Sequence, residues 1–249
     1  LVGSPAIVMA IGIFLLFPAR FLLGSLFHAE LVNDIVWSGT ILLGMFSVYL
    51  VILFIVQLKK DHTVLWGYSS NFFRMGTWVA GTNVLARVLQ PLSTTAGTVL
   101  SVAGWILWLL YMTWLIRTIL RTRLHQPING TAFLTTVATQ SVVLNILGLW
   151  SELSEVLICG LLVLNALGIV LYCVFFYLIW IVRGMKLQIA NWVPPNNITH
   201  GALSISLLAS QMLAVRMVTP SQWFRFALDI VWVVDAVFFA LIAVTELGL

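Results

Sequence analysis

The residues that could bring chemistry into this chain are polar side chains set at helical spacing inside apolar stretches. Arg87 shares one helical face with three small or polar residues, which are Gly76, Ala80 and Asn83. An arginine inside a membrane segment is a candidate for function, and its charge would suit a path for anions. The alternative is that the Arg87 side chain extends to the outer lipid headgroups beside Pro91.

Hydroxyl and amide side chains form two further sets. Thr135 and Thr139 share one helical face, and a second face holds Asn197, Gly201 and Ser204. Hydroxyl groups give anions weak contacts from which they can leave again, as conduction requires. The alternative is that these groups bond neighbouring helices or their own backbone. The spacing alone leaves both interpretations open.

The other ionisable side chains in apolar segments also have two interpretations each. Arg20 follows Pro18 and has the same two interpretations as Arg87, a place in an anion path or in the headgroup region. We expect Asp229 to pair with a nearby arginine or hydroxyl. The position of Asp235 inside an apolar segment is harder to explain. The alternative for both residues is a role as a proton-coupling acid. His200, near the start of a predicted helix, is either a hydrogen-bonded helix-end residue or a pH sensor.

Motifs for enzyme chemistry are not found in the sequence. The patterns HExxH and GxSxG, an Asp-rich cluster and a phosphate-binding glycine loop are all missing. His62 and His125 have no carboxylate or cysteine near them in sequence, so no metal site is predicted. Cys159 and Cys173 fall about 20 Å apart on one predicted helix and cannot pair. We therefore expect no enzyme activity, no cofactor and no metal.

The composition indicates a membrane protein. The 249 residues are 61% hydrophobic and only 8% charged, with a mean hydropathy of +1.09. A soluble domain of this length could not bury so much apolar surface. A β-barrel would show short alternating strands instead of long apolar runs. The fold class predicted is therefore an all-α polytopic membrane protein, and the net charge of +4 reflects basic loops rather than a nucleic-acid partner.

Apolar runs of about 18 to 30 residues predict about eight transmembrane helices in a single domain, 1–249. The expected spans are 5–27, 34–58, 70–90, 95–120, 131–150, 153–182, 197–218 and 223–247. The first is expected to bend near Pro18. The turns between the third and fourth spans and between the fifth and sixth are short, so these spans are predicted to form helical hairpins.

Loop charge predicts the orientation. Basic residues gather after the second, fourth and sixth spans: Lys59, Lys60, Arg74, Arg117, Arg121, Arg123, Arg183 and Lys186. Arg216 and Arg225, near the turn between the seventh and eighth spans, run weakly against this pattern. Acidic residues gather after the first and fifth: Glu30, Asp34, Glu152 and Glu155. By the positive-inside rule, the basic loops and the N-terminus are cytoplasmic. We expect an integral protein of a bacterial inner membrane.

The predicted spans alternate in bulk. The odd-numbered spans are rich in small and hydroxyl residues, whereas the even-numbered spans carry most of the tryptophan and phenylalanine. Small residues let helices approach closely, and bulky ones suit a face towards lipid. The alternation therefore predicts slim helices inside and bulky helices outside. The slim helices either surround an axis or pack into a solid bundle.

Three stretches on the odd-numbered spans carry a family resemblance. They are Thr77–Leu85 (TWVAGTNVL), Val137–Ser141 (VATQS) after an Asn-Gly pair, and Pro195–Ser206 (PNNITHGALSIS). Together and in this order they resemble the tellurite-resistance/dicarboxylate transporter family, which includes the slow-type anion channels of plant guard cells. Val8–Ile13 looks like a worn form of that family's first-helix motif, with Ile11 in place of a threonine. In the third stretch, Asn197 and His200 stand where the family often has an aromatic residue and a methionine.

The resemblance implies ten helices in five hairpins, with inner helices around a pore, and a homotrimer. With eight expected spans, this chain would supply four of the five hairpins. Because it begins with Leu1 rather than Met and stops at Leu249 just as a helix ends, we expect a fragment. The family's pore-occluding phenylalanine would fall beyond Leu249. The resemblance implies a channel or transporter for anions or organic acids of the C4-dicarboxylate kind, passive or proton-linked. The alternatives are efflux of tellurite or another toxic oxyanion, and a structural membrane subunit that conducts nothing.

The candidate pore-lining residues combine the small and polar positions of the odd-numbered spans. They are Gly12, Gly76, Ala80, Asn83, Arg87, Thr135, Thr139, Asn197, Gly201 and Ser204.

Overall fold

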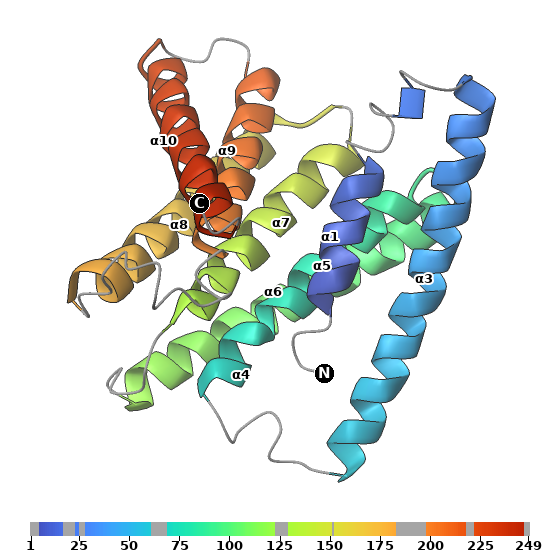
Figure 1. Ribbon diagram of the computed structural model, residues 1–249, viewed down its shortest axis with the longest axis horizontal. Coiled ribbons are helices and arrows are strands. Elements are labelled where there is room, and N and C mark those ends of the chain that lie inside the picture. The colour runs from blue at the N-terminus through green and yellow to red at the C-terminus, as the bar shows by residue number, and fades with distance from the viewer. Residues whose placement is uncertain are drawn as a thin grey trace. The chain divides into compact units, whose positions relative to one another are not determined.

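A computed structural model of the chain describes residues 5–16, 23–24, 28–60, 69–122, 129–150, 152–182, 198–217 and 222–246. Of these residues, 94% are helical, and none of them lies in a strand. The all-α architecture expected from the sequence is therefore confirmed (Figure 1). Pro18, Arg20, Asn197 and the pair Pro194-Pro195 lie outside the described residues.

Five stretches are long and apolar enough to cross a membrane. They lie in α3 (Ala29–Lys60), α6 (Thr94–Thr122), the 3₁₀ turn η2 (Gly130–Phe133) with α7 (Leu134–Leu149), α8 (Glu155–Phe176) with its π-helical extension η3 (Tyr177–Val182), and α9 (Ile198–Arg216). The other described helices are α1 (Pro5–Leu16), α4 (Ser69–Arg74), α5 (Gly76–Leu89) and α10 (Gln222–Glu246). The chain is a polytopic membrane protein.

The observed helices follow the expected spans with two local differences. α3 begins at Ala29, before the expected start at Asp34, and its first turn carries Glu30. A carboxylate is favourable at a helix N-terminus, so the helix can extend beyond its apolar part. The third span is interrupted at Met75, which separates α4 from α5.

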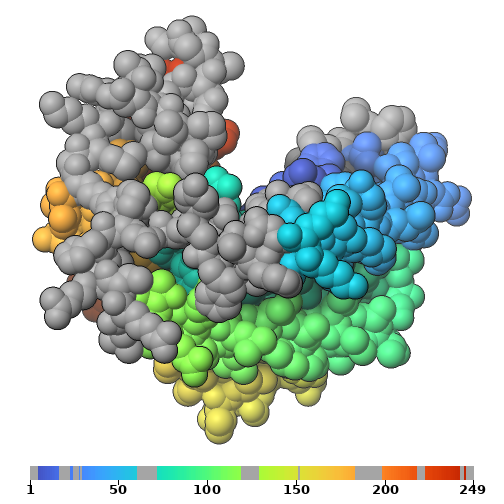
Figure 2. All heavy atoms as spheres, turned by 90° about the horizontal axis from the view of Figure 1, so that it is seen from below, coloured from blue at the N-terminus to red at the C-terminus, as the bar shows by residue number. Residues whose placement is uncertain are grey.

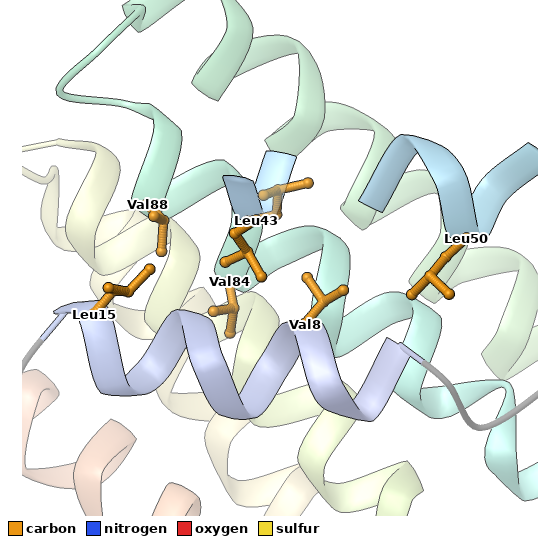
Figure 3. Close-up of a cluster of buried hydrophobic side chains, with 7 residues drawn as sticks. Val8, Leu15, Leu43, Leu50, Val84 and Val88 are labelled. Carbon is orange, nitrogen blue, oxygen red and sulfur yellow. The ribbon is translucent and has the colours of Figure 1, made fainter. Parts of the chain in front are cut away.

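Residues 1–121 form one compact unit, in which α1 lies against both α5 and α3. Its apolar core combines side chains of these three helices: Val8, Leu15, Leu43, Leu50, Val84, Leu85 and Val88. The labelled side chains of the cluster point towards one another across the helices (Figure 3). Gly12 makes the close approach possible, because a Cβ atom there would overlap the side chain of Val84.

α5 and α6 form the hairpin predicted between the third and fourth spans. The turn that joins them is short, with α5 ending at Leu89 and α6 beginning at Thr94. Gly97 brings α6 against the end of α5, since a Cβ there would lie 2.8 Å from the Cα of Gln90. About two helical turns further along α6, Gly104 faces the side chain of Asn83.

Residues 122–249 form a second compact unit. α7 packs against α8 and α9, and α9 also packs against α8 and α10. The apolar core joins α7, α8 and α9 through Val143, Leu147, Leu161, Ala209 and Leu213. The hairpin predicted between the fifth and sixth spans is observed as α7 and α8. The division of the chain into two units leaves the expected single domain a prediction.

Burial follows the predicted alternation of slim and bulky helices. In α7, 78% of the apolar span is buried, compared with 22% in α6 and in α8 and 11% in α3. The side chains of α3 (blue to cyan) and α6 (green) are visible over much of the surface in Figure 2. Not all the bulky residues face outward: Tyr172 and Phe175 of α8 are buried. The rings of Phe133 and Tyr172 lie 5.1 Å apart, so the inner face of α8 packs onto η2.

Candidate functional site

The candidate residues of α5 lie on its buried side. Gly76, Ala80 and Asn83 are all buried. The Asn83 amide donates to the backbone oxygen of Val79 at 3.0 Å, within its own helix. Its carboxamide oxygen lies against Gly104 of α6, where a Cβ would come within 2.6 Å. The polar face predicted from the sequence is thus directed into the protein and not to lipid.

Arg87 lies at the end of α5 and is half-buried. Its guanidinium donates from Nη1 to Oε1 of Gln90 at 2.6 Å. Gln90 caps the helix, and its own backbone N–H donates to Ala86. Arg87 therefore stands at the turn into α6, where a charge can serve either a path through the protein or the headgroup region.

The threonines of α7 are fully buried. Thr135 and Thr139 have no exposed surface, and the Thr139 hydroxyl donates to the backbone oxygen of Thr135 at 2.9 Å. A hydroxyl bonded four residues back along its own helix is satisfied without a partner helix. Such a hydroxyl could donate a hydrogen bond to an anion only if it gave up this bond to the backbone.

The candidates of α9 differ from one another. Gly201 is exposed, with open space around it, so it does not hold two helices together. Ser204 is half-buried and lies one turn after His200. The Ser204 hydroxyl donates to Oδ2 of Asp235 at 2.7 Å and also lies 3.1 Å from the backbone oxygen of His200. The sequence did not connect Ser204 with Asp235.

His200, Ser204 and Asp235 form one polar cluster between α9 and α10. Nδ1 of His200 lies 2.8 Å from Oδ1 of Asp235, and 22% and 14% of the two side chains are exposed. The two atoms are close enough for an ion pair whenever His200 is protonated, but they are not aligned as a hydrogen bond. The ring of Phe239 lies 5.5 Å from that of His200. Asp229, in contrast, is exposed on α10.

The cluster follows from how the hairpin folds. α9 ends at Arg216, α10 begins at Gln222, and the two helices pack against each other. His200 and Asp235 lie similarly far from these two helix ends. They therefore reach the same depth. Ser204 shares the face of His200 because residues four apart lie on one side of a helix.

A second buried network joins three helices, and the sequence analysis missed its central residue, Asn165. The Gln140 amide of α7 donates to the backbone oxygen of Asn165 in α8 at 3.1 Å. The Asn165 amide donates to the hydroxyl of Ser210 in α9 at 2.9 Å. Gly168 leaves the space for Gln140, because a Cβ there would overlap the Gln140 amide. The signal was a single amide in an otherwise apolar, bulky span.

The described residues include no group of three or more His, Cys, Asp or Glu side chains that could hold a metal ion. Cys159 and Cys173 are exposed free thiols. Comparison with family models, with curated proteins and with solved structures finds no match for this chain.

Proposed function

We propose that the protein is a membrane channel or transporter for anions, of the class of organic acids such as C4-dicarboxylates. The observation that carries the proposal is the position of the polar residues. The helices richest in hydroxyl and amide groups are also the most buried ones, as α7 shows most clearly. A bundle that only filled space could build its interior from apolar side chains, so a polar interior supports a path for a hydrated or charged solute.

The charges of the inner helices support an anion over a cation. Among the described residues of α1, α5, α7 and α9, the ionisable groups other than His200 are Arg87 and Arg216, both cationic. Arg216 donates to the backbone oxygen of Leu147 at 3.3 Å. Of the two acids of α10, Asp229 is exposed, and Asp235 faces the imidazole of His200, which can offset its charge. A path along the inner helices would therefore have a positive field.

The same proposal includes the cellular setting. The protein would be located in a bacterial inner membrane with its N-terminus in the cytoplasm, as loop charge predicts. The partners would be the lipid bilayer, small anions and two further copies of the chain in a homotrimer.

Solute flux into liposomes tests the proposal. The purified full chain is reconstituted, and uptake of radiolabelled succinate and of rubidium is compared with that of protein-free liposomes. We expect succinate uptake above the protein-free level and no rubidium uptake. A protein that admits neither solute would be a structural subunit, and one that admits rubidium alone would have the opposite selectivity.

A further inference from the structure

The cluster of His200, Ser204 and Asp235 lies within the protein, on helices of the membrane domain. Its two ionisable side chains are mostly covered. A carboxylate that is removed from water is costly unless it is paired. Asp235 has two partners, the imidazole of His200 at 2.8 Å and the hydroxyl of Ser204 at 2.7 Å. Two side chains of α9, one on each oxygen, therefore converge on a single carboxylate of α10.

The pair has no net charge when it holds one proton. With that proton on the imidazole, His200 is positive and Asp235 negative, and the two charges offset each other. Loss of the proton leaves a single covered negative charge, and gain of a second leaves a single positive one. Histidine gains and loses a proton near neutral pH. Proton binding at this pair therefore changes the charge of the protein interior.

Ser204 can keep a hydrogen bond to Asp235 whether the carboxyl group is ionised or protonated. Its hydroxyl has one hydrogen and two acceptors in reach, Oδ2 of Asp235 and the backbone oxygen of His200. When Asp235 is ionised, the hydrogen points to the carboxylate. When Asp235 is protonated, the acid can donate to the Ser204 oxygen while the hydroxyl hydrogen turns to the backbone of His200.

The other titratable groups around the cluster are few. From α8, Tyr172 lies within electrostatic reach of Asp235, while Cys173 and, in η3, Tyr177 are exposed. The described residues of η2 and α7 carry no titratable side chain.

On the two helices that build the cluster, Arg225 and Asp229 of α10 are exposed. Arg216 of α9 lies at the opposite end of that helix, bonded to Leu147. In the part of the chain that the structure describes, the phenol of Tyr172 is thus the one additional group placed to respond to the pair.

We propose that His200, Ser204 and Asp235 are a proton-binding site and that each anion moves together with a proton taken up there. The inference rests on the proposed anion transport and adds coupling to it. On uptake, a proton from the aqueous phase forms an N–H bond at His200, and on release on the other side this bond breaks. No other covalent bond changes. One negative charge of the anion is matched by the positive charge of the proton.

The test is succinate accumulation in liposomes that contain the full chain. Voltage is held at zero with potassium and valinomycin, and the lumen is about one pH unit more alkaline than the outside. One proton per anion predicts accumulation of up to about tenfold, since one unit corresponds to a tenfold ratio. Asp235→Asn and His200→Gln should lose this accumulation but retain downhill flux at equal pH. Ser204→Ala should weaken it.

Matched controls are available on the same chain. Asp229→Asn removes an exposed carboxylate from α10, and His28→Gln removes an exposed histidine; both should accumulate succinate as the unmodified chain does. Accumulation that persists in folded Asp235→Asn or His200→Gln would overturn the coupling, because the proton would then travel elsewhere. Downhill flux without accumulation in the unmodified chain would also overturn it and leave anion transport standing. Absence of any succinate flux would contradict the proposed function itself and, with it, the coupling.

A second measurement tests proton binding at the pair without requiring transport. A variant that keeps His200 as its sole histidine is labelled with ¹⁵N and titrated by NMR in micelles. We expect the imidazole to titrate, with a midpoint that moves when Asp235→Asn is added. An imidazole that does not titrate between about pH 5 and pH 9 would show that the pair is structural.

Discussion

Single buried polar side chains in this protein are mostly satisfied inside their own helix. Thr40 donates to Val36 and Ser101 to Gly97, each at 2.8 Å and each four residues back. Such a residue can lie in an apolar surrounding without a partner on another helix. The residues that carry more information are those that bond across helices, such as Asp235 with Ser204.

Arg87 is the residue on which the anion path can be tested most directly. If its charge attracts anions, Arg87→Ala should lower succinate flux by about tenfold, the effect of about 1.4 kcal/mol on the barrier. Arg87→Lys should retain much of the flux if a point charge is enough, and lose it if the guanidinium must also hold Gln90. Flux is measured in liposomes at equal protein content.

Arg117→Ala is the matched control, because Arg117 is exposed on α6. It should leave flux unchanged. If both Arg87 variants also transport at the unmodified rate, Arg87 belongs to the headgroup region and the path is lined by neutral groups alone.

Helices were more predictable from this sequence than their contacts. Run length and charge predicted where the helices lie, and five of the eight expected spans are observed as stretches long and apolar enough to cross a membrane, because such a segment must be long and apolar whatever surrounds it. Contacts depend instead on local shape, such as the space that Gly12 leaves for Val84. The bonds of Asn165 and Asp235 were not predictable for the same reason, since each joins residues on different helices whose rotation the hydropathy does not define.

The α5–α6 hairpin offers a test of close helix packing. In Gly97→Ala the new methyl group would meet backbone atoms of Gln90 and Ala86, which cannot move aside as a side chain can. We expect a loss of about 1–3 kcal/mol in the free energy of unfolding, as overpacking typically causes. The measurement is the unfolding transition in mixed micelles.

Gly160→Ala is the control, because no atom lies within 4 Å of a Cβ at this position in α8. Alanine favours helix over glycine, so this variant should be neutral or slightly more stable. Equal destabilisation by the two substitutions would show that the effect is general to glycine replacement and that α5 and α6 do not meet at Gly97.

At the scale of the whole molecule, the predicted orientation depends on a few loop charges. Lys59 and Lys60 end α3 as exposed basic residues, whereas Glu155 begins α8 and Glu152 precedes it. The positive-inside rule counts lysine and arginine, so the segment with Lys59 and Lys60 is predicted to be cytoplasmic and the one with Glu152 and Glu155 to be outside.

Cysteine labelling in whole cells tests the orientation. The native Cys159 and Cys173 are exposed and must first be replaced with serine. A cysteine at Glu152 should react with an impermeant maleimide from outside, and one at Lys60 only after the membrane is opened. Labelling of both from outside would contradict the predicted topology, and a cysteine at Lys186 provides an independent cytoplasmic position.

The polar interior of α7 has a consequence for biogenesis. α7 is less apolar than α8, and the amide of Gln140 bonds to the backbone of α8. A nascent helix with uncompensated amides enters lipid poorly from the translocon. α7 should therefore remain at the translocon until α8 has been synthesised. The two helices should then partition into the bilayer together. The order of synthesis along the chain, slim helix first and bulky helix second, would then make each hairpin a unit of insertion.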